Sequence, residues 1–352
     1  MLFKHATSPH IRQNISVHDM MFSVVYALIP GALLSFFFFG WGVLFNLLIA
    51  ISVCLSLEAV ILKMRQRDVS SALNDGSALL TACLLALALP PLAPWWLTVI
   101  ASFFAIAVAK HLYGGLGFNP FNPAMVGYIV VMISFPLEMT MWTAPFGVEH
   151  GNMTGWPDFT TTFNWVFLGT LPFGQTIDSI SMATPIDLIK TQLSQFHDIA
   201  ETRADPRFAP LFDAASGTGW QWINLAYLAG GIWLCRKGVA DWRIPVSLLI
   251  SLVLISNLFA VIDYSSNSSA LFHVLSGGTM LCAFFIATDP VSASTTPRGR
   301  WIYGASIGAL IFIIRNWGGY PDGIAFAVVL MNIAVPLIDY YTQPKVYGDP
   351  NV

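Results

Sequence analysis

Charged residues are scarce in this chain of 352 residues: 10% of them are charged, whereas 56% are hydrophobic. Soluble domains carry roughly 25% charged residues. With 16 lysines and arginines against 19 acids, the chain lacks the charge to cover a water-facing surface of its size. The composition therefore excludes a soluble enzyme and a nucleic-acid-binding protein.

Cysteine is also rare. The four cysteines, Cys54, Cys83, Cys235 and Cys282, all lie within apolar stretches, and none forms a Cys-x-x-Cys pair. No cluster of cysteine and histidine has the spacing of metal ligands. We therefore expect buried thiols and no metal or haem site held by this chain alone.

Long apolar runs dominate the sequence instead. A run of about 20 apolar residues crosses the bilayer core of roughly 30 Å as a helix. We count ten such runs, at approximately 20–39, 41–62, 77–89, 94–112, 122–136, 219–235, 243–262, 270–287, 300–315 and 321–341. The third is short and begins with polar residues, which favours a tilted or broken helix. The sequence thus predicts an all-α polytopic membrane protein with about ten transmembrane helices.

The distribution of lysine and arginine predicts the orientation of these helices. Residues 1–19 contain no cleavable signal peptide, so we expect the first helix to stay in place as an anchor. If the N-terminus is cytoplasmic, 12 of the 16 basic residues fall on the inner side, as the positive-inside rule requires. Both termini are then cytoplasmic. The long loop 137–218, with nine acids against three bases, is a small extracytoplasmic lobe.

The two halves of the chain resemble each other. The segment 75–80 is similar to 276–281, and Lys110 before two glycines has a counterpart in Arg315 before two glycines, about 200 residues later. Because each half holds five helices, the second copy is inverted relative to the first. The alternative is that glycine and proline simply punctuate any polytopic membrane protein.

These features divide the chain into five parts. They are a cytoplasmic N-terminal segment (1–19), a first five-helix repeat (20–136), a periplasmic loop (137–218), a second five-helix repeat (219–341) and a cytoplasmic C-terminal tail (342–352).

The sharpest local signal is Asp-Ser-Ile-Ser-Met-Ala-Thr-Pro at 178–185. It matches the pattern Asp-x-x-Ser/Thr-x-Ala-Thr, which flavin transferases recognise when they join the phosphate of FMN to a threonine hydroxyl. In this pattern Thr184 is the acceptor, and Asp178, Ser181 and Ala183 belong to the recognised motif. The alternative is an ordinary turn in which Thr184 caps the next helix in front of a proline.

Nearly the whole chain resembles the D subunits of the Rnf (Rsx) electron-transport complexes. The motif at 178–185, the ten apolar runs and the phrase Gly-Phe-Asn-Pro-Phe-Asn-Pro-Ala at 117–124 carry the resemblance, although Met182 stands where many relatives have glycine. The same family includes the B subunits of the sodium-pumping NADH:quinone oxidoreductases. The resemblance implies FMN bound covalently to Thr184 and a place in the bacterial inner membrane. It also implies partner subunits with a second flavin and iron-sulfur clusters, and a flavin transferase for maturation.

Asn119 and Asn122 form a second candidate site at the start of the fifth run. Two asparagine side chains offer both donors and acceptors, as the uracil-like edge of an isoalloxazine ring does. In the family this segment is linked to a second, non-covalently bound flavin such as riboflavin. Lys110 lies near enough in sequence to neutralise a reduced flavin. The alternatives are N-capping for the asparagines and snorkelling to the interface for Lys110.

Other ionisable residues lie in or near the apolar runs, where such groups are functional candidates by default. Glu58 is little more than one turn from Lys63, Arg315 ends the ninth run, and Asp339 nears the end of the tenth. Each is close enough to an interface to pair or to reach water, so we favour no direct ion-coupling role. Asp289, which precedes a proline, more simply ends a helix.

Two functions remain. In the first, the chain is a flavin-carrying subunit of a complex that couples electron transfer between ferredoxin- or NADH-type carriers to cation translocation. In the second, it is a stand-alone channel or solute carrier built from an inverted repeat. Colour distinguishes them, because only the flavoprotein would be yellow. No motif for NADH or iron-sulfur binding occurs in the chain, so other subunits must supply the electron donors and acceptors.

Overall fold

The structure, a computed structural model, describes residues 16–150, 153–213, 215–320 and 322–344. Most of the expected N-terminal segment, most of the C-terminal tail, and Pro321 at the start of the tenth run lie outside the described residues.

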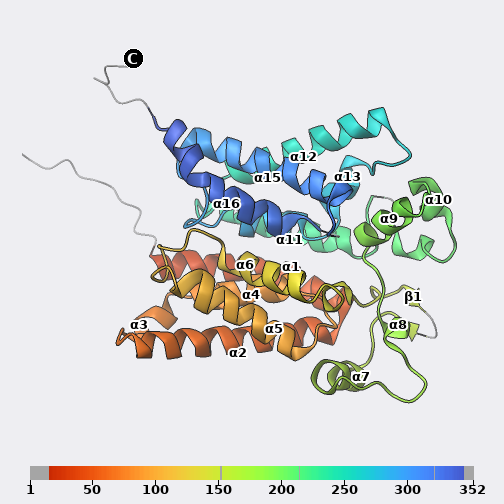
Figure 1. Ribbon diagram of the computed structural model, residues 1–352, viewed down its shortest axis with the longest axis horizontal. Coiled ribbons are helices and arrows are strands. Elements are labelled where there is room, and N and C mark those ends of the chain that lie inside the picture. Colours follow the sequence, from red (N-terminus) through yellow and green to blue (C-terminus); the bar gives the residue numbers. More distant parts are fainter. Residues whose placement is uncertain (1–15, 151–152, 214, 321, 345–352) are drawn as a thin grey trace, which may run out of the picture.

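The described residues form a helical bundle with one very short hairpin (Figure 1). The helices of the first part are α1 (Val17–Phe39), α2 (Trp41–Met64), α3 (Val69–Asn74), α4 (Ser77–Ala88), α5 (Trp95–Phe103), which continues as η1 (Phe104–His111), and α6 (Pro123–Ser134). Those of the last part are α11 (Trp220–Arg236), α12 (Arg243–Ile262), α13 (Ala270–Leu275), α14 (Thr279–Leu281), which continues as η5 (Cys282–Ile286), α15 (Pro297–Trp317) and α16 (Ile324–Tyr341).

Each of the ten predicted apolar runs coincides with helix in the described part of the chain. Four of these helices, α1, α2, α12 and α16, are long and apolar enough to cross a membrane by themselves. The segments α4, α5 with η1, and α6 are apolar but shorter. The chain therefore has the helices of a polytopic membrane protein, several of which need neighbours to complete a crossing.

Two of the predicted spans are interrupted or shortened by glycine. Before α4, Gly76 has a left-handed backbone with φ 77°, and the helix that follows is short, as its polar start predicts. The predicted span 270–287 is not continuous: α13 ends before Gly277, which has φ 60°, and α14 begins two residues later. Glycine adopts such a backbone without steric strain, so both breaks are properties of the local sequence.

The segment 137–218 gathers at one end of the bundle (Figure 1). Its elements are η2 (Glu138–Thr140), the strands β1 (Glu149–His150) and β2 (Met153–Thr154), α7 (Phe159–Phe163), η3 (Asn164–Leu168), α8 (Ile177–Ile180), α9 (Pro185–Ser194), α10 (Ile199–Ala204) and η4 (Ala209–Leu211). The Lys190 ammonium donates to the backbone oxygens of Ile314 (3.2 Å) and Tyr320 (2.6 Å), which fixes α9 against the end of α15.

The two halves share one hydrophobic core. Leu85 and Met125 from the first half belong to the same buried cluster as Tyr227 and Phe312 from the second. Three of the cysteines are buried as expected, whereas Cys235 is only half-buried. The shared core holds the helix breaks of both halves at fixed positions, and the two cavities described next are built around them.

Candidate functional site

A cavity lies where both halves of the bundle meet the segment 137–218. We call it the Thr184 cavity. The space measures about 800 Å³ with its open mouth included. Its residues come from α4 and α6, from η2 and the start of α9, and from the break at 277–278 and the start of α16. The cavity is thus formed only when the chain is fully folded.

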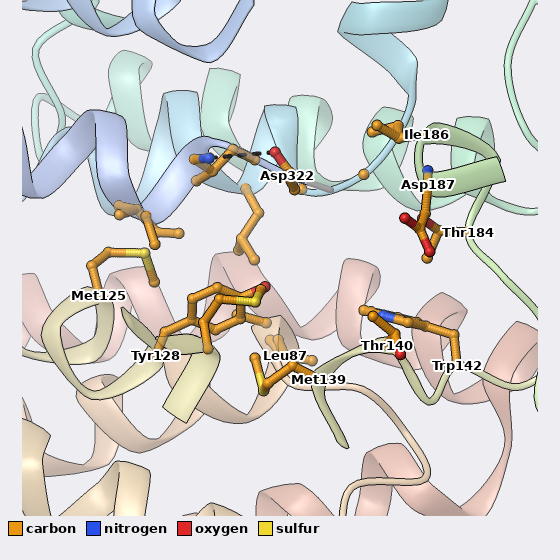
Figure 2. A pocket seen from close by; sticks show the side chains of 18 of the residues that line it. Leu87, Met125, Tyr128, Met139, Thr140, Trp142, Thr184, Ile186, Asp187 and Asp322 are labelled. Atoms are coloured by element: carbon orange, nitrogen blue, oxygen red, sulfur yellow. Dashed lines mark hydrogen bonds between the residues drawn. The ribbon is translucent and has the colours of Figure 1, made fainter. Parts of the chain in front are cut away.

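Most of the surface of the Thr184 cavity is apolar and aromatic. Tyr128, Trp142 and Trp220 contribute rings, and Met125, Met132 and Met139 contribute thioethers. In Figure 2, Thr184 and Asp187 face the cavity from one side, while Tyr128 and Trp142 face it from below. Flat aromatic side chains and adaptable methionines suit a planar heterocycle.

Thr184 stands at the start of α9. Its backbone is extended, with φ −67° and ψ 156°, and its hydroxyl oxygen accepts a hydrogen bond from the backbone N–H of Asp187 at 3.3 Å. Pro185 occupies the first helical position. The capping interpretation of Thr184 is therefore confirmed. The side chain of Thr184 is half-buried and lines the cavity.

The rest of the motif holds Thr184 in place. Ser181 pairs with Thr143 in an antiparallel bridge, and the N–H of Met182 donates to the oxygen of Trp142 at 2.7 Å. Ala183 is half-buried beside Thr184, and Asp178 is exposed on the short helix α8. The motif thus forms an extended strap that ends at the cavity, with its acid facing outward.

The charged groups of the Thr184 cavity are acidic. Asp187 and Asp322 are the charged members of its described surface, and the cations that accompany them lie behind it. Burial raises the pKa of Asp187 above its usual value, and the positive charge of Lys190 opposes this effect. Asp322 is bound to the buried guanidinium of Arg315, with Nε to Oδ1 at 3.2 Å.

Asn119, Asn122 and Lys110 line a second cavity, which we call the Asn119 cavity. It measures about 720 Å³ with its mouth included, and it also contains Ser77 and Asp289. The tertiary structure therefore brings together all three residues that the sequence indicated for a second site. It adds the start of α4 and the loop after η5, which comes from the other half of the chain.

The two asparagines differ in which side-chain atoms remain available to hydrogen-bond a ligand. Asn122 caps α6: its oxygen accepts from the N–H of Met125 at 3.2 Å, and its amide nitrogen donates to the oxygen of Ile286. Asn119 donates to the oxygen of Phe121, but its own side-chain oxygen is buried without a hydrogen-bond partner. A buried acceptor without a partner carries a free-energy penalty, so Asn119 is the member of the pair that suits a ligand with an N–H donor.

Lys110 does not snorkel to an interface, and Glu58 does not pair with Lys63. The Lys110 ammonium is 1% exposed and donates to both carboxylate oxygens of Glu58 at 2.7 Å and to the hydroxyl of Ser77 at 2.8 Å. These three bonds use all three of its protons. Lys110 is therefore already neutralised before any ligand enters the cavity.

The sequence did not single out Asp187, Trp142 or Trp220, which all line the Thr184 cavity. It indicates Asp322 only by its place at the start of a span in the second half. That place is a usable signal, since inverted repeats put ligand sites at such helix breaks. Asp187 and the tryptophans lack any comparable pattern in the sequence.

Comparison with known proteins identifies the family of this chain. The model of the NQR2, RnfD, RnfE family matches residues 4–348. The chain belongs to this family. Relatives named as the D subunit of an ion-translocating oxidoreductase complex include one from Vibrio vulnificus (strain YJ016), 50% identical, and one from Vibrio cholerae (strain O395), also 50% identical. In each case the match covers 99% of this chain and 100% of the relative. A relative of the same name from Escherichia fergusonii is 48% identical, with 99% of both chains covered.

Membership of the NQR2, RnfD, RnfE family makes the chain an integral membrane subunit of a redox-linked ion-translocating complex. The resemblance noted from the motif at 178–185 and the apolar runs is confirmed. The long helices of the structure agree with this membrane location.

Proposed function

We propose that this chain is the flavin-carrying membrane subunit of its complex and holds FMN covalently on Thr184. One observation carries the proposal: the hydroxyl of Thr184 lines an aromatic cavity that joins both halves of the bundle. A flavin attached there is held in one orientation between the membrane helices. The bound flavin would supply the electron-transfer chemistry, whereas the protein supplies binding, orientation and electrostatics.

The attachment is a phosphoryl transfer. The Thr184 oxygen forms a bond to the phosphorus of the flavin phosphate, the bond from phosphorus to a leaving group breaks, and the hydroxyl proton passes to a base. The donor must be a phosphoanhydride of the flavin, because a simple phosphate ester would have to expel a poor leaving group. The product phosphate sits at the N-terminus of α9, a ten-residue helix whose dipole favours an anion.

We infer a second, non-covalent flavin, such as riboflavin, in the Asn119 cavity. The buried oxygen of Asn119 suits an N–H donor of the isoalloxazine edge, and Thr81 and Thr288 line the same space. Asn122 supports this site by fixing the start of α6. Lys110 lines this cavity, but its charge is already paired with Glu58, so it offers no unpaired positive charge to the flavin.

Asn119→Leu should remove the non-covalent flavin and leave the covalent one, because the leucine offers no acceptor to the flavin N–H. Losing one such pairing costs about 1 to 3 kcal/mol, so the affinity for the non-covalent flavin should fall about 5- to 150-fold. Asn122→Leu should reduce stability more, since it also removes a helix cap. Flavin released by acid precipitation and measured by chromatography checks this prediction. Equal flavin release from a folded Asn119→Leu chain, or from the double variant with Asn122→Leu, would assign both residues to capping alone.

We also propose that the two halves are an inverted repeat of five helices each. In the first half a buried cation, Lys110, bonds the hydroxyl of Ser77 at the start of α4. In the second half Arg315 bonds the hydroxyl of Thr279 at the start of α14, at 3.0 Å. The same device, a buried cation that holds the start of a broken helix, thus occurs in both halves and supports the duplication.

The basic residues support an outward orientation of the segment 137–218. At the opposite end of the bundle Arg65 donates to the oxygen of His111, Lys237 to Ser23, and Arg300 to Asp241. Because cytoplasmic loops collect lysine and arginine, we propose that this end and both termini face the cytoplasm of a bacterial inner membrane. The Thr184 cavity then opens toward the periplasm.

Reporter fusions test this orientation. A fusion after Asp213 should be active only as a periplasmic reporter, and a fusion after Val352 only as a cytoplasmic one. Alkaline phosphatase and a fluorescent protein at each site give the two readouts. If both sites respond to the same reporter, the arrangement of five plus five inverted helices is wrong.

The complex named in the relatives supplies the partners in this proposal. We propose that electrons pass between ferredoxin- or NADH-type carriers through this chain, a second flavin-carrying subunit and iron-sulfur subunits, while cations cross the membrane. A flavin transferase is required for maturation.

Mass spectrometry of the purified chain tests the covalent flavin directly. A peptide containing Thr184 should gain the mass of an esterified flavin phosphate, and the band should fluoresce in a denaturing gel. An unmodified peptide and a colourless chain from cells that contain the transferase would support the alternative, a stand-alone channel or carrier.

A further inference from the structure

We propose that the ion pair of Arg315 and Asp322 sets the reduction potential of the flavin held on Thr184. This inference rests on the proposed function and assigns a role to two residues that do not bond the flavin covalently. Both residues act on the flavin through the electrostatic field of their charges.

Asp322 faces the same space as Thr184. It lies just before α16 and lines the Thr184 cavity on the side opposite Tyr128, where its carboxylate accepts a hydrogen bond from the backbone N–H of Ile324 (Figure 2). The Asp322 side chain is 24% exposed, whereas the Arg315 side chain, which does not line the cavity, is 1% exposed. The negative charge of Asp322 therefore lies at the cavity wall, and the positive charge of Arg315 lies behind it.

The position of Arg315 is fixed by several acceptors. Its Nη1 donates to the oxygen of His273 at 2.7 Å and its Nη2 to the hydroxyl of Thr279 at 3.0 Å. Asp322 is fixed as well, since it also accepts from the N–H of Ile324 at 3.3 Å. Removal of the charge of Asp322 would consequently leave Arg315 in place.

Gly277 shows how closely the backbone encloses this pair. A Cβ atom on Gly277 would lie 2.7 Å from Oδ2 of Asp322 and 3.1 Å from Nη2 of Arg315. With φ 60°, the position also suits glycine best. The helix break is thus shaped around the ion pair, and the pair lies at the wall of the cavity.

The apolar surroundings of the cavity strengthen the electrostatic effect of these charges on a bound flavin. The described surface of the Thr184 cavity is apolar apart from a few groups, and its charged members are Asp187 and Asp322. In such surroundings a unit charge acts far more strongly than in water. Reduction adds two electrons to the flavin, and each electron that arrives without a proton makes the ring more negative. Asp322 opposes this added charge and Arg315 favours it.

The variant Asp322→Asn tests the balance. It keeps the shape of the side chain and an oxygen for the N–H of Ile324, but it leaves the charge of Arg315 uncompensated. The ratio of reduced to oxidised covalent flavin at a fixed potential should rise about tenfold, which for a two-electron couple is about 30 mV toward positive potential. Asp322→Glu keeps the charge and should stay near the parent value.

The measurement is a dithionite titration of the full-length chain in nanodiscs, followed by flavin absorbance, with dithionite as the source of electrons. Subtraction of the same titration of Thr184→Val isolates the covalent flavin. Glu201→Gln serves as a control, because it removes an exposed acid of the segment 137–218 that lies outside the cavity. It should leave the potential unchanged.

The outcomes separate this inference from the proposed function. In-gel fluorescence first establishes whether each variant carries covalent flavin. If the parent chain carries none, the proposed function fails and the tuning role fails with it. If flavin is present and Asp322→Asn keeps the parent potential while it changes only thermal stability, the ion pair is a structural latch and the tuning role alone is overturned.

Discussion

We expect the Thr184→Val chain to fold and to carry no covalent flavin. Valine has nearly the volume of threonine but lacks the nucleophilic oxygen, so no phosphoester can form. The lost cap should lower stability by about 0.5 to 2 kcal/mol, since the hydroxyl accepts from the N–H of Asp187. Peptide mass spectrometry and in-gel flavin fluorescence measure the modification, and thermal unfolding measures the cap.

Thr184→Asn separates the two roles of this residue. Asparagine is among the best N-cap residues, so α9 should keep its start, yet its amide cannot accept a flavin phosphate. Ser181→Ala is the control within the motif. Its bridge to Thr143 is made by the backbone, so this variant should retain the modification, at most less completely. Covalent fluorescence that persists in Thr184→Asn would place the flavin on another residue.

The second large effect concerns the buried pair of Lys110 and Glu58. We expect Lys110→Met to destabilise the chain by about 3 to 5 kcal/mol, because it leaves a buried carboxylate without its partner. The carboxylate is 2% exposed, and its other basic neighbour, His111, lies 3.5 Å away. Thermal unfolding in detergent, followed by circular dichroism, should show a clear loss of stability.

A double variant and a surface pair make this prediction specific. Glu58→Gln combined with Lys110→Met removes both charges and should recover much of the loss, as replacement of buried pairs often does. Arg207→Met breaks an ion pair with Asp205 in which the arginine is 77% exposed. Such exposed pairs contribute little to stability because water screens the charges, so this variant should unfold like the parent. If Lys110→Met unfolds like Arg207→Met, His111 must already neutralise Glu58.

Glu58 also shows why pairing within the membrane region could not be read from the sequence. Lys63 is nearer along the chain, but residues five apart point to different sides of a helix, and only those three or four apart are neighbours. The actual partner, Lys110, is 52 residues away and comes from η1. The packing of α2 against α4 and η1 decides this contact.

The sequence by itself determined the helices, the membrane class, the family and the motif at 178–185, for which we propose a role in flavin attachment. Apolar runs fold into helices wherever the backbone must satisfy its own hydrogen bonds. The start of α9 follows from Thr184 and Pro185 alone, because capping is a local interaction. The short helix α4 follows likewise from the polar residues and glycine before it.

Only the tertiary structure decided what surrounds these residues. Thr184 meets Asp322 in one cavity although 137 residues separate them along the chain. The break at Gly277 packs against both Arg315 and Asp322. The side-chain oxygen of Asn119 lacks a partner, whereas both side-chain polar atoms of Asn122 are hydrogen-bonded. These properties depend on distances between elements far apart in the chain. Local propensity and apolar periodicity contain no information about such distances, so the charges around each cavity became visible only in the folded molecule.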